Sequence, residues 1–281
     1  MDAQLRSDDN SRAVHAHFAR GLARAFAGAV IFGLPLMMTM EMWWLGFYMA
    51  PGRLALLLAL FFPFLVVLSW HSGFEQTFSW RDDVVDAFVA YAVGFAASAL
   101  VLWLIGMLDR ETPLREAVGK VSLQAVPASI GALLAQSMLG ERETAGNVRG
   151  GATSYASELF IMALGALYLA FNLAPTEEMV QIAWRLGPLG CAVLMLASLA
   201  VIHTFVYTVA FRGRPRHRPV SGWSLLLRFS VVGYALALLL CGGLLWSFGR
   251  LDGLAPAAAL QSIAVMGFPA AVGAAAARLI L

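Results

Sequence analysis

The stretch Val126-Pro-Ala-Ser-Ile-Gly-Ala-Leu-Leu-Ala135 recurs as Phe268-Pro-Ala-Ala-Val-Gly-Ala-Ala-Ala-Ala277, with five of the ten positions identical. Membrane folds are often built from duplicated halves, so a recurring apolar stretch of this kind indicates an internal repeat. Weaker matches occur in the same order along the chain: Val93-Gly-Phe-Ala96 with Val232-Gly-Tyr-Ala235, Leu123-Gln124 with Leu260-Gln261, His71 with His203, and Ala50-Pro51 with Ala174-Pro175. Their order predicts two halves of similar structure.

The whole chain is as apolar as these stretches. Of its 281 residues, 60% are hydrophobic and only 13% are charged, and the mean hydropathy is +0.76. A soluble domain carries about 25% charged residues. The composition therefore predicts an integral membrane protein and excludes a disordered chain or a disulfide-stapled secreted module. The apolar runs are continuous, which favours an all-α protein over a β-barrel with its alternating strands.

Eight apolar runs are long enough to cross a bilayer, which takes about 20 helical residues. We place them near residues 25–48, 54–70, 84–108, 121–139, 155–174, 187–211, 224–248 and 257–281. The fourth run is the most polar, but including it puts thirteen basic residues on the cytoplasmic side and six outside, as the positive-inside rule requires. We therefore expect both termini and the Arg212–Arg218 loop to be cytoplasmic, and Glu177 and Arg250 to be outside.

The organisation that follows is a polytopic membrane protein of eight transmembrane helices, arranged as two four-helix repeats. Residues 1–24 form a polar cytoplasmic tail, 25–139 the first repeat, 140–154 a cytoplasmic linker and 155–281 the second repeat. Because each repeat crosses the membrane an even number of times, the two have parallel orientation and are predicted to be related by a twofold axis along the membrane normal. A transport path is expected between them.

Acidic and amide side chains within the runs are the candidates for a transport path. A carboxylate in hydrocarbon costs at least about 2.5 kcal/mol and is tolerated mainly where it faces protein or water. The candidates are Glu41, Glu158, Asn172 and Asp86. Glu158, Gly165 and Asn172 lie seven residues apart on one helix stripe, which predicts that this stripe faces the protein interior.

Each acid also has an ordinary structural interpretation. Glu41 is expected about 25 Å along the first helix, where it could extend its carboxylate to the lipid headgroups. Asp86 lies near a helix start, where an acid stabilises the helix dipole. Glu177 and Glu178 after Thr176 are typical of a capped helix start, with a cation-attracting vestibule as the alternative.

Three further features are weaker candidates. Pro127 and Pro269 break equivalent helices and could expose backbone carbonyls to an ion. His71 and His203 are expected near the cytoplasmic face, where a histidine can sense pH. We find no phosphate-binding loop, catalytic triad or metal-ligand spacing, so we expect no enzyme activity, catalytic residue, metal or cofactor, and no nucleic-acid partner.

Three stretches carry a resemblance to a known family: Gly33-Leu-Pro-Leu-Met-Met-Thr-Met-Glu-Met-Trp-Trp-Leu-Gly46, Ser154-Tyr-Ala-Ser-Glu158 and Asn172-Leu-Ala-Pro-Thr-Glu-Glu178. The chain after its tail resembles a bacterial family of integral membrane proteins, the domain of unknown function 2391. The resemblance implies a bacterial inner-membrane location and a small companion membrane protein. It implies no activity and no catalytic residues.

Two functions are compatible with these features. The first is a channel or secondary transporter for an inorganic cation or protons, in which Glu41, Glu158 and Asn172 line the path. The alternative is a membrane scaffold or sensor that carries nothing and acts with a partner membrane protein. In either case the protein contacts the lipid bilayer, and a homo-oligomer is compatible with the sequence.

Overall fold

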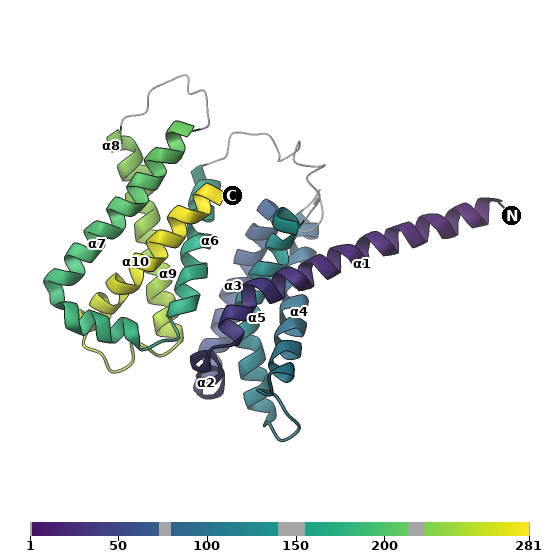
Figure 1. Ribbon diagram of the computed structural model, residues 1–281, viewed down its shortest axis with the longest axis horizontal. Coiled ribbons are helices and arrows are strands. Elements are labelled where there is room, and N and C mark those ends of the chain that lie inside the picture. Colours follow the sequence, from purple (N-terminus) through teal and green to yellow (C-terminus); the bar gives the residue numbers. More distant parts are fainter. Residues whose placement is uncertain (1, 73–79, 140–154, 213–221, 281) are drawn as a thin grey trace. The chain divides into compact units, whose positions relative to one another are not determined.

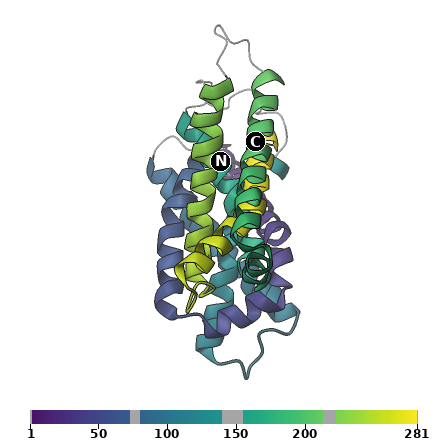
Figure 2. The same cartoon turned by 90° about the vertical axis from the view of Figure 1, so that its left-hand side faces the viewer.

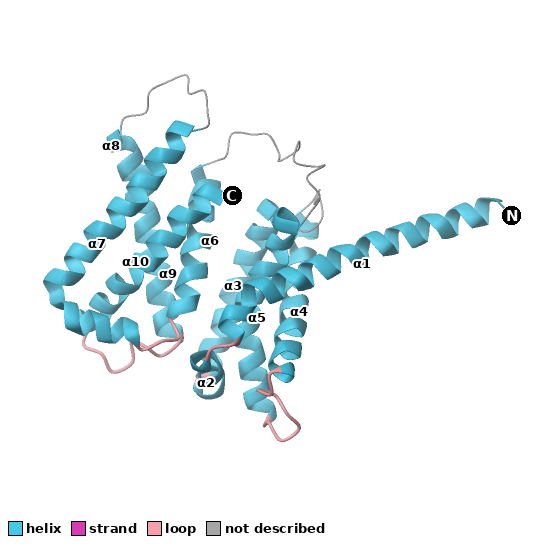
Figure 3. Ribbon diagram, viewed as in Figure 1, coloured by secondary structure: helices cyan, strands magenta, loops and turns pink. Residues whose placement is uncertain are grey.

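The computed structural model describes residues 2–72, 80–139, 155–212 and 222–280, and all the regular elements in these ranges are helices (Figure 3). The chain divides into two compact units, Met1–Val148 and Arg149–Leu281. The predicted all-α membrane architecture is confirmed. The predicted linker 140–154 and most of the Arg212–Arg218 loop lie outside the described residues.

In the described part of unit 1, four helices surround a central one. They are α1 (Asp2–Met37), α2 (Met40–Tyr48), α3 (Pro51–Ser72), α4 (Trp80–Leu104) and α5 (Leu114–Leu139), as Figure 1 shows. The other four helices all contact α5. The residues of the predicted polar tail are helical and continue into the first membrane span as part of α1.

Unit 2 is built around its last helix in the same way. Its elements are α6 (Tyr155–Leu173), α7 (Glu178–Arg212), α8 (Gly222–Leu225), the π-helix η2 (Leu226–Val231), α9 (Val232–Ser247) and α10 (Pro256–Ile280). Helix α10 lies against α6, α7 and α9 (Figures 1 and 2).

Eight helices in the described ranges are long and apolar enough to cross a membrane. They comprise Phe18–Met37, Pro51–Trp70, Trp80–Leu104, Leu114–Ala135, Tyr155–Leu173, Glu178–Val206, Trp223–Ser247 and Pro256–Arg278. The fourth span is buried inside the protein over 83% of its length, more than any other. Its polar residues therefore face protein instead of lipid, which explains why the most polar of the runs can cross.

The first predicted segment is not one helix, because the chain breaks at Met38 and Thr39. Pro35 lies in the last turn of α1, and Thr39 is extended with φ −102° and ψ 135°. The Trp43 indole donates a hydrogen bond of 2.6 Å to the Met37 carbonyl, which satisfies one of the free acceptors at the end of α1. Glu41 therefore lies in the first turn of the separate helix α2, not far along the first span as predicted.

Helix α7 contains the corresponding break. Gly187 has φ 64° and ψ −177°, which only glycine adopts readily, and Pro188 follows it. The residues before Gly187 therefore form a short helix like α2, and those after it form the long span. The candidate span begins at Glu178, earlier than the predicted start at 187, and the backbone break at Gly187 lies within it.

Close backbone contacts between glycines hold each central helix. A Cβ on Gly131 of α5 would overlap the carbonyl oxygen of Gly28 on α1, and a Cβ on Gly28 would overlap that of Gly131. Gly165 on α6 and Gly273 on α10 have the same reciprocal relation. Small residues allow membrane helices to approach and gain van der Waals contact, because the lipid provides no hydrophobic force between them.

Identical residues at matching structural positions recur at near-constant spacing. The pairs 137 residues apart are Gly28 and Gly165, Leu36 and Leu173, Thr39 and Thr176, Glu41 and Glu178, Met42 and Met179, and Pro51 and Pro188. The pairs 143 apart are Tyr91 and Tyr234, Leu102-Trp103 and Leu245-Trp246, Gly106 and Gly249, and Leu108-Asp109 and Leu251-Asp252. The pairs 142 apart are Pro127 and Pro269, and Gly131 and Gly273.

Local geometry repeats at these positions as well. The Thr39 hydroxyl donates to the Leu36 carbonyl and the Thr176 hydroxyl to the Leu173 carbonyl, both at 2.8 Å. Gly106 and Gly249 both have φ +74°. These matches give a residue-by-residue correspondence between the units, while the twofold axis along the membrane normal stays a prediction.

The correspondence changes the register of some of the weaker sequence matches. Helices α5 and α10 are both continuous, so the spacing that pairs Pro127 with Pro269 also pairs Gln124 with Met266. The predicted match of Gln124 with Gln261 is therefore wrong. Likewise, Pro51 begins the long span of unit 1 and corresponds to Pro188, not to the predicted Pro175.

The match of Gly94 with Gly233 is wrong by about one helical turn. A Cβ on Gly94 would meet Ser129 of α5, whereas a Cβ on Gly233 would meet Met162 of α6. The two glycines therefore face different neighbours, and the 143-residue spacing pairs Gly94 with Ala237 instead.

We predict that Gly131→Val and Gly273→Val each destabilise the protein by about 1–3 kcal/mol, the usual cost of overpacking. The reason is that the new side chain would meet the backbone of the neighbouring helix. Thermal unfolding in detergent measures the loss. Gly243→Val is the matched control, because no atom lies within 4 Å of a Cβ there. Equal midpoints for Gly131→Val and Gly243→Val would contradict the close contact.

Candidate functional site

Buried polar side chains concentrate in the interior of unit 1. On α4 these are Asp83, Asp86 and Ser98, and on α5 they are Lys120, Ser122, Gln124 and Ser129. Each has at most 9% of its surface exposed. Such groups are costly in a membrane protein and mark candidate ion or proton pathways.

The acidic end of this interior lies near the start of α4. Asp83 is 4% and Asp86 6% exposed, and the Ser69 hydroxyl of α3 donates a hydrogen bond of 3.2 Å to the Asp86 carboxylate. The predicted stripe of Asp86, Ala90, Gly94 and Ala97 is buried throughout. Asp86 is beyond the first turn of α4, where an acid interacts less with the helix dipole, so a dipole role explains Asp83 better than Asp86.

The middle of the interior contains polar atoms with no hydrogen-bond partner among the described residues. Neither amide atom of Gln124 has one, and neither does the Ser98 hydroxyl, although both residues are 0% exposed. The Ser129 hydroxyl donates to the Ala125 carbonyl at 2.6 Å. A buried polar group without a partner costs about 1–3 kcal/mol, so these two sites require an explanation.

The polar groups are spread across most of the bilayer. Gly94 packs beside Ser129 of α5, and Ser98 lies one turn further along α4. Asp86 and Ser98 are twelve residues apart, about 18 Å of helix. Lys120 follows at the far end, where its ammonium binds the Glu116 carboxylate at 2.5 Å and the Met107 carbonyl at 3.3 Å.

The acid of unit 2 already has a basic partner. The Arg278 guanidinium of α10 binds the Glu158 carboxylate of α6 at 2.7 Å and lies 5.0 Å from the centre of the Phe229 ring. The two charged side chains are 10% and 20% exposed. This ion pair joins the first and last helices of the unit and neutralises Glu158.

The stripe predicted on α6 faces α10. Gly165 packs on Gly273, and Glu158 binds Arg278 of the same helix. Asn172 is half-buried, and its amide donates to the Tyr168 carbonyl of its own helix at 2.7 Å. The structure therefore brings Glu158 and Gly165 to one interface, and it gives the Asn172 amide nitrogen a partner within α6.

The other predicted acids lie at helix starts. Glu41 is half-buried in the first turn of α2, and Glu178 is exposed in the first turn of α7, where an acid favours the helix N-terminus. Glu177 is 74% exposed and pairs with Arg250 at 3.0 Å. Arg250 also donates to the Pro175 carbonyl, so the pair joins the two connections at this end of unit 2.

The predicted histidines and prolines are in separate places. A nitrogen of His203 on α7 lies 3.1 Å from the Ser230 hydroxyl of η2, and His71 is on α3, with its side chain outside the described part. Pro127 and Pro269 both lie within continuous helices, so neither breaks its helix in two. Because proline has no N–H, the Leu123 carbonyl loses its usual helical partner.

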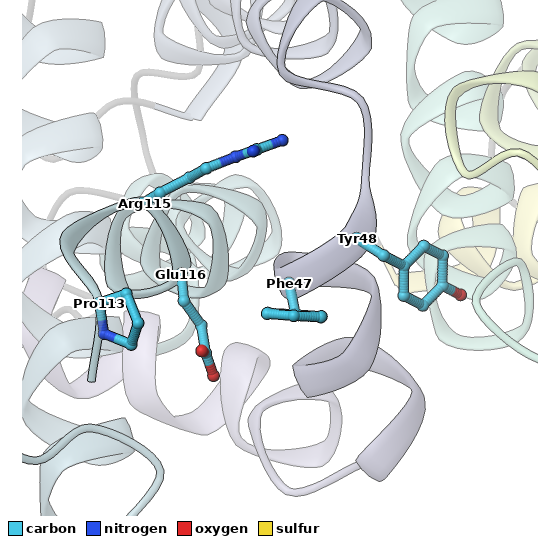
Figure 4. A pocket seen from close by; sticks show the side chains of 5 residues that line it. All are labelled: Phe47, Tyr48, Pro113, Arg115 and Glu116. Carbon is cyan, nitrogen blue, oxygen red and sulfur yellow. The ribbon is translucent and has the colours of Figure 1, made fainter. Parts of the chain in front are cut away.

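A cavity of about 300 Å³ lies in unit 1 between α2 and the start of α5. Phe47, Tyr48, Pro113, Arg115 and Glu116 line it. Figure 4 shows the charged ends of Arg115 and Glu116 pointing apart and the Tyr48 ring turned away from Glu116, so these groups do not converge on one ligand. Within the described ranges no group of three His, Cys, Asp or Glu residues could hold a metal ion.

Sequence reasoning missed the centre of the unit 1 interior. Gln124 and Ser98 are both 0% exposed. From the sequence alone, Gln124 is used only in the repeat match with Gln261, and Ser98 is not singled out. The signal that could have identified them is the correct repeat register, in which Gln124 corresponds to Met266 and Ser98 to Cys241.

Comparison with known proteins gives one match. Residues 21–281 match the family model described as "Putative integral membrane protein (DUF2391)". Neither a curated protein nor a solved structure matches the chain. The match covers all eight spans except the first three residues of the first one.

We predict that Glu158→Gln destabilises unit 2 by about 1–3 kcal/mol, because it leaves the Arg278 charge without its carboxylate in a largely buried position. Thermal unfolding of the purified protein measures this, and the double variant Glu158→Gln with Arg278→Gln should recover part of the loss. The matched control is Glu177→Gln, an exposed pair expected to contribute less than about 1 kcal/mol. An equal effect of the two single variants would contradict the structural role of the buried pair.

Proposed function

The chain belongs to this family of integral membrane proteins, and we propose that it transports protons or a small cation through the interior of unit 1. The observation that carries the proposal is the series of buried polar groups from Asp83 and Asp86 to Gln124 and Lys120. Intramembrane ionisable residues that face the protein interior are typical of ion pathways and proton relays.

The proposed path differs from the one expected from the sequence. Glu158 is assigned a structural role because Arg278 already balances its charge, and Glu41 is assigned to the helix start that it shares with Glu178. Asp86 is retained, since it is buried within the unit. The path thus runs inside unit 1.

A scaffold role has less support from these contacts. A protein that only binds a partner needs no unpaired polar groups in its interior, whereas Gln124 and Ser98 are both buried and have no hydrogen-bond partner among the described residues. Cooperation with a small companion membrane protein, or with a second copy of the chain, is compatible with transport and is part of the proposal.

We place the protein in the bacterial inner membrane with both termini in the cytoplasm, on the strength of the basic residues counted above. Cysteine labelling in spheroplasts tests this orientation. A cysteine replacing Thr176 is expected to react with an impermeant reagent, and one replacing Ala16 is expected to be protected. The reverse pattern would show that the orientation is inverted.

The transport proposal predicts that Asp86→Asn lowers ion flux into liposomes by at least about tenfold, because it removes the buried titratable group of the relay. Flux is measured with purified protein and an imposed proton, Na⁺, K⁺ or Ca²⁺ gradient. The matched control is Asp82→Asn, one turn earlier on the same helix, where the side chain is exposed; it should retain the wild-type flux. Wild-type vesicles indistinguishable from empty ones for all four ions, with any companion subunit present, would refute the proposal.

A further inference from the structure

Comparison of corresponding positions in the two units indicates which residues of unit 1 are needed for folding. In the register fixed by Pro127 and Pro269, three of the four buried polar positions of α5 correspond to apolar ones of α10: Ser122 to Ala264, Gln124 to Met266 and Ser129 to Ala271. In the register fixed by Leu102-Trp103 and Leu245-Trp246, Ser98 on α4 corresponds to Cys241 on α9. All eight of these residues are at most 4% exposed. The fourth polar residue of α5, Lys120, corresponds to Ser262, which is polar and buried as well.

These substitutions nearly conserve side-chain volume. The side chains of Gln and Met are unbranched and of similar length. Ser has one oxygen atom more than Ala, and Cys has a sulfur atom in place of the Ser oxygen. Unit 2 therefore packs the same positions without polar atoms. The polar set of unit 1 is not needed to build a unit of this kind, although it carries the cost of burying hydrogen-bonding groups.

Gln124 is the most informative member of the set. Its amide offers two N–H donors and one carbonyl acceptor, and neither heavy atom has a partner in the described part of the chain. The next position towards the start of α5, Leu123, has a carbonyl whose helical partner is removed by Pro127. The Gln124 amide thus brings both donors and an acceptor to the buried part of the span.

This set of groups suits water and not a metal cation. A buried water forms about three hydrogen bonds and can both donate and accept, as the Gln124 amide requires. A hard cation such as Ca²⁺ takes six or more oxygen ligands, and K⁺ filters use rings of carbonyls. The Gln124 amide contributes one oxygen, and its N–H₂ group repels a cation.

We infer that the transported species is the proton, and that it crosses the middle of unit 1 on water hydrogen-bonded to Gln124. The inference rests on the proposed function and specifies the substrate of the same path. A proton reaching the acidic end converts the Asp86 carboxylate to the neutral acid. Release of that proton to water restores the carboxylate, so the charge balance closes without another reactant.

The test compares Gln124→Met with the wild type in liposomes, because Met is the residue that unit 2 has at the corresponding position. Proton flux is followed with an internal pH indicator under an imposed membrane potential, and Na⁺, K⁺ and Ca²⁺ fluxes are measured in the same preparations. We expect the wild-type protein to carry protons and none of the three metal cations. We expect Gln124→Met to lower the proton flux by at least about tenfold, since a thioether cannot hold the water.

Gln261→Met on α10 is the matched control. It is the same chemical change at a half-buried position of the corresponding helix, and it should leave the proton flux unchanged. Thermal unfolding shows whether Gln124→Met is folded. If it is not, Gln124→Leu and the reactivity of a cysteine at 124 towards small water-borne reagents, with Cys191 and Cys241 replaced, provide the same test.

The possible results distinguish failure of the proton inference from failure of the proposed function. Metal-cation flux without proton flux would overturn the proton inference and leave transport standing. Proton flux that persists in folded Gln124→Met, or a residue 124 cysteine that never reacts, would overturn the role of Gln124 in holding water. Absence of flux for all four ions would overturn the proposed function itself.

Discussion

The close approach of two backbones at glycine is the contact on which each unit depends. Gly28 meets Gly131 in unit 1, and Gly165 meets Gly273 in unit 2. In a bilayer the helices cannot gain from leaving water, so the energy of association comes from contact between backbones at short range. This contact fixes α5 and α10 as the central helices of their units. The other constraints on the side chains of these two helices arise because protein surrounds both helices.

Enclosure allows the central helix to carry groups that lipid would reject. In α10 the enclosed positions are almost entirely apolar, as Met266 and Ala271 illustrate, whereas α5 has Gln124 and Ser129 at the same places. Helices α5 and α10 can be compared directly, because they belong to one chain and each packs around the same kind of glycine contact. Gln124 has no protein partner among the described residues and unit 2 packs Met266 at the same place, so packing alone does not explain the amide.

The spans could be predicted from the sequence, because length and hydropathy decide them locally. The break at Thr39 could not, since it depends on the way Trp43 turns back to the Met37 carbonyl. The repeat was found through Pro127 and Pro269, but matching Gly94 with Gly233 shifted one helix by a turn, and in an Ala- and Leu-rich helix nothing local corrects such a shift. The partner of Glu158 was beyond reach for a different reason, because Arg278 lies 120 residues further along the chain.

We infer that water binds beside Gln124 in unit 1, at the position where unit 2 has Met266. A high-resolution experimental structure in a lipid nanodisc tests it most directly, since ordered water next to a buried amide is visible as density. We expect water density within hydrogen-bonding distance of both Gln124 amide atoms, and no water density beside Met266. A Gln124 amide bonded to protein groups on both sides, with no water near it, would contradict the account.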